Sequence, residues 1–106
     1  MPKQQPQVSY TLLRNYTELF QWKESRTGFL RKGFNPPAEG VTDVTRVPFF
    51  IRYVTSSGKV EEGTVTCISV QPERQQRKIK FVQSGEIRIV YDYLVVEVDG
   101  TRFLSH

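Results

Sequence analysis

The chain has 106 residues, which is enough for one domain and too few for two independent cores. Hydrophobic residues make up 38% of it and charged residues 25%, so we expect a packed core rather than a disordered chain. The formal net charge is +4, from 15 Lys and Arg against 11 Asp and Glu. The chain is therefore basic, which allows acidic partners such as nucleic acid.

Several classes of protein are excluded by what the sequence lacks. No apolar run approaches the roughly 20 residues that a membrane helix needs, and residues 1–7 have no apolar leader core. We therefore expect a soluble, intracellular, cytoplasmic protein without a membrane partner. The single cysteine, Cys67, excludes an internal disulfide and a multi-cysteine zinc site. The single histidine, His106, is the last residue, where chain ends are usually frayed.

A change in composition near residues 47–48 divides the chain into an N-terminal arm, residues 1–47, and a β domain, residues 48–106. The arm holds four of the six prolines and the segment GFNPPAEG at residues 33–40, which the interior of a regular element would not tolerate. The second part is rich in Val, Ile, Thr, Phe and Tyr and contains Ser-Gly and Asp-Gly turn signals.

The arm begins with a pattern that favours one amphipathic helix over residues 9–26. At 100° per residue its apolar side chains share one face, namely Leu12, Leu13, Tyr16, Leu19 and Phe20. Ser9 or Thr11 would be the N-cap, and Gly28 would end the helix. A strand is the competing interpretation, from the alternation of Phe20 and Trp22.

The rest of the arm, residues 26–37, is expected to be irregular and extended before its two prolines. The β domain is expected to form five strands, near residues 48–55, 59–70, 77–83, 86–98 and 101–105. This order and size predict a mainly β fold, a small five-stranded antiparallel SH3-like barrel over residues 48–105. An OB-type barrel is less favoured because it needs a longer chain and a helix between strands.

Three hairpins connect the predicted strands. Asp99-Gly100 is a type I′ turn signal that sets Glu97 opposite Arg102 and Val98 opposite Thr101. Ser57-Gly58 closes another hairpin, whose register stays open. Within the longer segments we expect a bend at Gly63 and a bulge at Asp92, where the apolar alternation slips.

The Ser84-Gly85 turn is best explained by a three-residue loop with Gly85 in the left-handed region. That loop would place the apolar residues on one face, namely Ile79, Phe81, Ile87 and Ile89. It would place the cations Lys78, Lys80 and Arg88 together on the other face.

Catalysis is disfavoured by the inventory of reactive groups, and we expect no enzyme, cofactor, metal or small-molecule substrate. Cys67 lies inside a predicted strand, where a lone cysteine is usually a small buried hydrophobe. Glu61 and Glu62 are neighbours on a strand, so their side chains point to opposite faces. No Gly-rich phosphate loop or metal-binding spacing occurs.

The basic residues suggest a nucleic-acid interface. The predicted phosphate contacts are Arg31, Lys32, Arg74, Arg77, Lys78, Lys80 and Arg88. The β domain carries eight cations against seven anions, whereas the arm carries seven against four. The alternative is that these cations keep a sheet solvated and protect it from edge pairing.

Aromatic residues give the arm a second possible role. Basic and aromatic residues alternate over residues 26–34, so this segment could follow a nucleic-acid strand. It could equally dock its apolar side chains on the barrel or on a partner. Trp22, Phe34 and Tyr93 are the candidates for base stacking or for an interface.

Two functions follow from the sequence. The leading hypothesis is a non-enzymatic binding module that engages nucleic acid through the arm and a Lys/Arg sheet face. The alternative is a structural or assembly subunit, for example of a virus or mobile-element particle, that forms a homo-oligomer through its arm.

Overall fold

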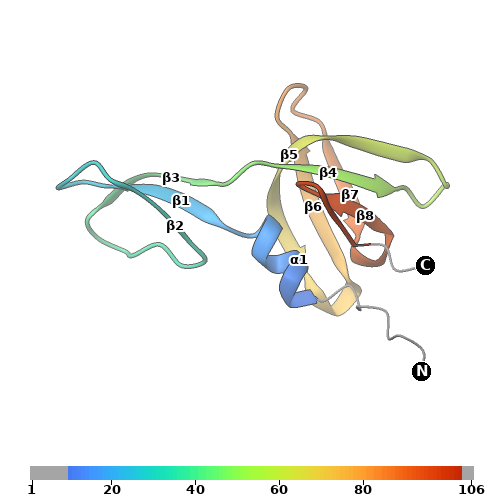
Figure 1. Cartoon of the computed structure of the whole chain (residues 1–106), viewed down its shortest axis with the longest axis horizontal. Helices are drawn as coiled ribbons and strands as arrows, with labels where there is room; N and C mark the ends of the chain where they lie inside the picture. Colours follow the sequence, from blue (N-terminus) through green and yellow to red (C-terminus); the bar gives the residue numbers. More distant parts are fainter. Residues whose placement is uncertain (1–9, 104–106) are drawn as a thin grey trace.

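The structure, a computed structural model, describes residues 10–103, with side chains from Leu13 onward. The fold is mainly β, with one short α-helix and two antiparallel sheets (Figure 1). In chain order the elements are α1 (Tyr10–Thr17), β1 (Phe20–Glu24), β2 (Leu30–Gly33), β3 (Val41–Arg46), β4 (Phe49–Val54), β5 (Val60–Gln71), η1 (Pro72–Arg74), β6 (Gln76–Phe81), β7 (Ile87–Tyr91), η2 (Asp92–Leu94), β8 (Val95–Val98) and β9 (Thr101–Arg102).

The body of the protein is a six-stranded sheet in the order β7-β6-β5-β4-β8-β9. Its inner face carries the buried core, to which every strand from β4 to β8 contributes apolar side chains. Helix α1 packs on this core through Leu13, which is fully buried, and through Tyr16, whose ring meets Phe103 edge-on at 5.8 Å. The first part of the arm therefore belongs to the body.

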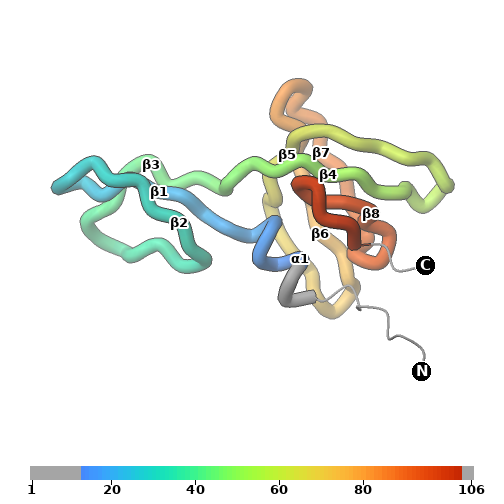
Figure 2. The backbone as a smooth tube through the Cα atoms, in the orientation of Figure 1, coloured from blue at the N-terminus to red at the C-terminus, as the bar shows by residue number. Residues whose placement is uncertain are grey.

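The remainder of the arm is a separate three-stranded sheet, β2-β1-β3, which we call the projecting sheet. Figure 2 follows the backbone outward along β1 and back toward the body along β3. The molecule measures 51 × 38 × 26 Å, and its radius of gyration is 15.4 Å, against about 13 Å for a compact domain of this size. The projecting sheet is the reason for this elongation.

The predicted helix over residues 9–26 is correct only for its first half. Helix α1 ends at Thr17, and the alternation of Phe20 and Trp22 belongs to β1 instead. Strand β1 pairs with a strand on each side, and this pairing prevails over the helical spacing of the apolar residues. The segment expected to be irregular likewise contains β2. The candidate N-cap Ser9 lies outside the described residues.

The expected five-stranded closed barrel is not found. The segment predicted as one bent strand, residues 86–98, is two strands joined by the 3₁₀ turn η2, where a bulge at Asp92 was expected. This turn carries the chain from one side of the sheet to the other, because β7 pairs with β6 and β8 pairs with β4. Among the described residues no ladder joins β7 to β8 or β9, so the sheet is open.

Two of the three predicted hairpins form as expected. At the Asp99-Gly100 turn Glu97 faces Arg102 and Val98 faces Thr101, and both turn residues have positive φ. The hairpin at Ser57-Gly58 pairs Val54 with Val60, which settles the register that the sequence left open.

The third hairpin differs from the prediction by one residue. Gly85 has the predicted positive φ, but its loop contains four residues rather than three, so Lys80 pairs with Ile87 and Lys78 with Ile89. Because side chains alternate between faces, this shift turns every side chain of β7 over. Arg88 therefore lies opposite Ile79, on the other face from the two lysines.

Gly63 occupies a place in β5 where no side chain fits. A Cβ atom there would lie 2.9 Å from Cε1 of the Phe81 ring. We expect Gly63→Ala to lower the free energy of unfolding by about 1–3 kcal/mol, because the ring must move. Urea unfolding measures this loss, and the loss should shrink in a Phe81→Leu background. An equal loss in both backgrounds would contradict a clash with the ring.

Candidate functional site

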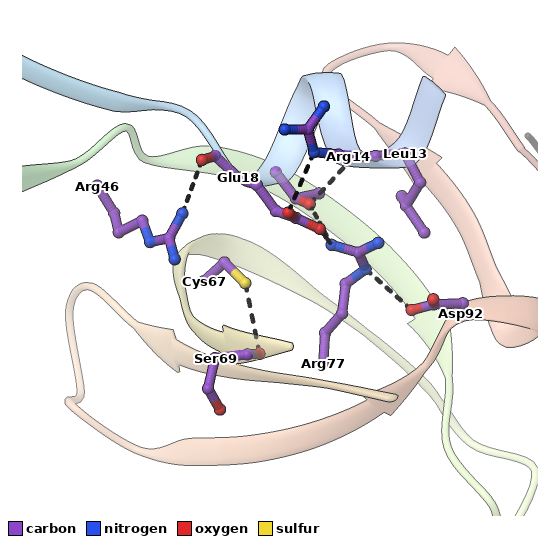
Figure 3. Close-up of polar contacts among 9 residues, drawn as sticks. Leu13, Arg14, Glu18, Arg46, Cys67, Ser69, Arg77 and Asp92 are labelled. Atoms are coloured by element: carbon purple, nitrogen blue, oxygen red, sulfur yellow. Dashed lines mark hydrogen bonds and ion pairs between the residues drawn. The ribbon is translucent and has the colours of Figure 1, made fainter. Parts of the chain in front are cut away.

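The centre of the polar structure is Arg77, whose side chain is only 1% exposed (Figure 3). Its Nε donates to Asp92 Oδ1 at 2.9 Å and its Nη1 donates to Thr17 Oγ1 at 2.8 Å. The same Nη1 also donates to the carboxylate of Glu18. One guanidinium of β6 thus holds the end of α1 and the turn η2.

This cluster is a buried ion pair with a high desolvation cost. Burial raises the pKa of Asp92 above its usual value, although the Arg77 guanidinium acts in the opposite direction. Asp92 Oδ2 is buried and has no hydrogen-bond partner among the described residues. The Glu18 carboxylate also forms an ion pair with Arg14, whose Nε lies 3.7 Å from it. Removal of any one partner would leave a buried charge without its counter-charge and would lower the free energy of unfolding.

This placement corrects the expectation that Arg77 lies beside the outward cations and contacts phosphate. Arg77 is one residue from Lys78, so strand alternation turns it to the inner face with Ile79 and Phe81. The sequence contained this signal, because those two apolar residues were already expected to face the core.

The other predicted cations of the body do not form one surface. Lys78 and Lys80 face outward on β6, and Arg74 is exposed in η1. Arg88 lies on the opposite face from the lysines, where its Nη2 contacts Glu86 at 3.1 Å and its Nε lies 3.9 Å from Glu61 Oε1.

The two predicted cations of the arm lie on β2. Arg31 Nε contacts Glu24 Oε2 at 3.1 Å, so its charge is balanced within the projecting sheet. Lys32 is exposed next to it. The structure therefore places Arg74 and Lys78 around one shallow pocket, which the buried Arg77 also lines, with Lys80 farther along the same face of β6. Arg31, Lys32 and Arg88 lie elsewhere.

The three predicted aromatic residues have three different environments. Trp22 is buried in the projecting sheet, where its ring packs on Gly33. A Cβ atom at Gly33 would lie only 3.1 Å from Cη2 of this ring. Phe34 lies under the guanidinium of Arg14, at 3.8 Å from the ring centroid. Tyr93 is 55% exposed and stacks on Tyr91, so it is the most exposed of the three.

The outer end of the projecting sheet carries two exposed apolar residues that we call the tip pair, Phe29 and Leu30. Their side chains are 60% and 70% exposed, the largest apolar exposure in the projecting sheet. The turn is nevertheless ordered, since Glu24 N donates to Phe29 O at 2.9 Å and Gly28 N donates to Glu24 O at 2.8 Å. Thr27 Oγ1 also donates to Glu24 Oε1. Hydrogen bonds from Thr27 and Arg31 hold the pKa of Glu24 below its usual value.

A shallow hollow that is largely open to solvent, which we call the basal groove, lies where the projecting sheet meets the outer face of the body. Its apolar lining comes from both sheets, namely Phe20, Val44, Ile68 and Ile87. The last three are exposed, and Ile87 reaches 51%. The charged residues of the lining are two cations, Arg46 and Lys80. Sequence reasoning missed this groove because its two walls are far apart in the chain.

The remaining reactive group is Cys67, which is fully buried as the sequence predicts. Burial raises the pKa of its thiol, and its Sγ donates to the carbonyl of Ser69 at 3.6 Å.

Within residues 10–103 no cluster of three or more His, Cys, Asp or Glu residues could hold a metal ion. In the same part of the chain no helix is long and apolar enough to cross a membrane.

Comparison of the chain with protein-family models, curated proteins and solved structures gave no match.

Removal of the buried guanidinium tests the role of Arg77. We expect Arg77→Met to lower the free energy of unfolding by about 3–5 kcal/mol, because Glu18 and Asp92 then lose their buried counter-charge. The matched control is Arg74→Met, an exposed site three residues away, which should change stability by about 0.5 kcal/mol or less. Urea unfolding followed by circular dichroism, which reports on both sheets, measures both losses. Similar small losses in the two variants would contradict a structural role for Arg77.

Proposed function

We propose that this protein is a non-enzymatic binding module that joins other protein subunits through its projecting sheet. The observation that carries this proposal is the tip pair, two large apolar side chains in solvent at the end of an ordered turn. Burying such a side chain contributes about 1.5–3 kcal/mol, so its exposure in a free chain is unfavourable unless a partner covers it.

Order in the turn supports the same function. The hydrogen bonds around Glu24 fix the backbone of Phe29 before any partner arrives. A side chain that is already positioned loses less conformational entropy on binding than one in a mobile loop. The tip pair is thus suited to act as a pair of interface residues.

The charges of the molecule favour a protein partner over a polyanion. Of the seven cations expected to contact phosphate, Arg77 is buried, and Arg31 and Arg88 are paired with glutamates. Acidic side chains thus balance much of the positive charge of the arm and of β7.

Replacement of the tip pair tests this function. We expect the full chain to self-associate with a dissociation constant of about 40 μM or weaker, because two buried apolar side chains contribute at most about 6 kcal/mol. Phe29→Ser combined with Leu30→Ser should remove this association, because the covered apolar area is lost. Sedimentation velocity and light scattering measure it.

The matched control for the tip variant is Val60→Ser, which removes an exposed apolar side chain from the β4–β5 hairpin. It should associate like the unaltered chain. A full chain that is monomeric at every concentration, or a tip variant that associates normally, would contradict the proposal.

Nucleic-acid binding is a second candidate, and one observation favours it. Arg74 and Lys78 line a shallow pocket whose other lining residues include no acidic side chain, and Lys80 follows on the same face. Cations grouped in this way can neutralise neighbouring phosphates. The exposed ring of Tyr93, on the adjoining turn η2, is the aromatic surface we assign to this candidate.

A titration distinguishes this second candidate from the first. If it holds, fluorescence anisotropy with single-stranded DNA or RNA should show binding whose affinity falls with salt. Lys78→Ala with Lys80→Ala should weaken binding and reduce the salt slope by about 2, while Lys59→Ala, an exposed lysine elsewhere, should change little. Absence of binding at low salt would exclude this function.

For the body we propose an SH3-like arrangement of strands that has not closed into a barrel. Its support is the order β7-β6-β5-β4-β8, in which a 3₁₀ turn brings the last strand beside the first strand of the meander. Helix α1 covers part of the core through Leu13, where closure would otherwise be needed.

A further inference from the structure

A polar pocket of about 140 Å³ lies on the outer face of the body, over the paired strands β5 and β6 and beside the edge strand β7. We call it the cationic pocket. Its charged lining residues are Arg74, Arg77 and Lys78, and its uncharged polar lining residues are Ser69, Gln71 and Gln76. Sites that enclose a drug-sized ligand measure roughly 300–1,000 Å³, so this smaller pocket suits a single small chemical group.

A β-bulge in β5 turns part of this lining to the outer face. Cys67 is buried in the core, and Ser69, two residues later, would face the core as well in a regular strand. The register of β5 against β6 shifts between these two residues, with Ile68 as the extra residue, so Ser69 lies opposite the outward Lys78. Gln71 follows on the same outer face. Bulges commonly re-aim side chains beside functional sites.

An ordered turn positions the backbone of Arg74. The next residue, Gln75, has φ 54° and ψ 44°, a left-handed conformation that is uncommon for residues other than glycine. Its N–H donates to the carbonyl of Pro72 at 3.0 Å, and its carbonyl accepts a hydrogen bond from the N–H of Asp92 at 2.8 Å. The chain beside Arg74 is therefore fixed to η1 and to η2.

The charge that a ligand would meet comes from two cations. The guanidinium of Arg77 is engaged in the buried cluster (Figure 3). Within the described residues Arg74 and Lys78 have no ion-pair partner, whereas Arg52, for example, contacts two glutamates. No acidic residue lines the pocket, and Glu73, next to Arg74 in the chain, is exposed outside the lining. The local field of the pocket is thus positive.

We propose that the cationic pocket binds one phosphate group. Phosphate carries about −1.5 to −2 charges at pH 7 on strong acceptor oxygens, which match two cations and no carboxylate. The hydroxyl of Ser69 and the side-chain amides of Gln71 and Gln76 are further donors, and these three side chains make no hydrogen bond within the described part of the chain. The site goes beyond the proposed function, because it lies on the body rather than on the projecting sheet.

The phosphate group has two sources, free phosphate and a nucleotide. Tyr91 lies opposite Gln76 in β7 and stacks on the exposed Tyr93, with ring centroids 5.6 Å apart. An aromatic ring beside a phosphate site is a surface on which a base can stack. Tighter binding of adenosine monophosphate than of inorganic phosphate, with shifts at both tyrosines, would identify the nucleotide. Equal affinities would identify the phosphate group alone.

Titration of the isotope-labelled full chain with sodium phosphate, followed by heteronuclear NMR at constant ionic strength, tests the proposal. Saturable shifts are expected in the backbone amides of residues 69–78 and in the side-chain amides of Gln71 and Gln76. Arg74→Gln and Lys78→Gln should each weaken binding by about tenfold, because each removes a charge-assisted hydrogen bond.

The matched control is Lys59→Gln, which removes an exposed cation from the loop between β4 and β5 and should bind phosphate like the unaltered chain. Arg74 and Lys78 are exposed, so their variants should fold, and circular dichroism checks this. Absence of saturable shifts in the pocket up to about 50 mM phosphate would overturn the proposal. Equal shifts with NaCl at the same ionic strength, or undiminished binding in both pocket variants, would overturn it as well.

Failure of this site is distinguishable from failure of either candidate function. Phe29→Ser with Leu30→Ser should bind phosphate normally, because the tip pair is not part of the pocket, whatever its effect on self-association. Single-stranded DNA that binds without shifting the pocket would support nucleic-acid binding and overturn the phosphate site. If phosphate binds in the pocket and DNA does not bind, the phosphate site stands and nucleic-acid binding fails.

Discussion

The buried guanidinium of Arg77 is the interaction on which the rest of the structure depends. It draws Thr17 and Glu18 at the end of α1 and Asp92 in η2 onto β6, and so fixes both the helix and the turn that carries the chain to β8. The carbonyl of Glu18 also accepts a hydrogen bond from Arg46 at the base of the projecting sheet. The direction in which that sheet leaves the body is therefore set at the same cluster. Burying a charge carries a desolvation penalty, and what the buried Arg77 provides in return is the specification of one arrangement of these elements.

The burial of this charge also changes what the surface can do. A net charge of +4 allows a polyanion partner, but one of the cations is internal and others are balanced by neighbouring glutamates. What the surface offers instead is apolar, a tip pair at one end of the projecting sheet and a groove at the other.

The sequence could predict those parts of the site that depend on local chemistry. Phe29 and Leu30 stand out as large apolar residues in a basic, glycine-bounded segment, and their docking on a partner was one of the alternatives. The groove could not be found in this way, because Val44 and Ile87 come together only when two sheets meet. Trp22 is a similar case, since its burial depends on the close approach of Gly33 on the neighbouring strand.

The sequence by itself determined the β character of the chain, the positions of the three hairpin turns after residue 48, and the register at Asp99-Gly100, because a type I′ turn requires positive φ at two adjacent residues. The tertiary structure alone decided which face each side chain of β7 occupies and where α1 ends. The physical reason is that strand side chains alternate with a period of two, so one extra residue in the loop before β7 moves Arg88 to the other face. Helical and strand spacings also compete over residues 18–24, and pairing of β1 with two neighbours resolves that competition. The +4 charge is a property of the sequence, but its distribution over the surface is a property of the fold.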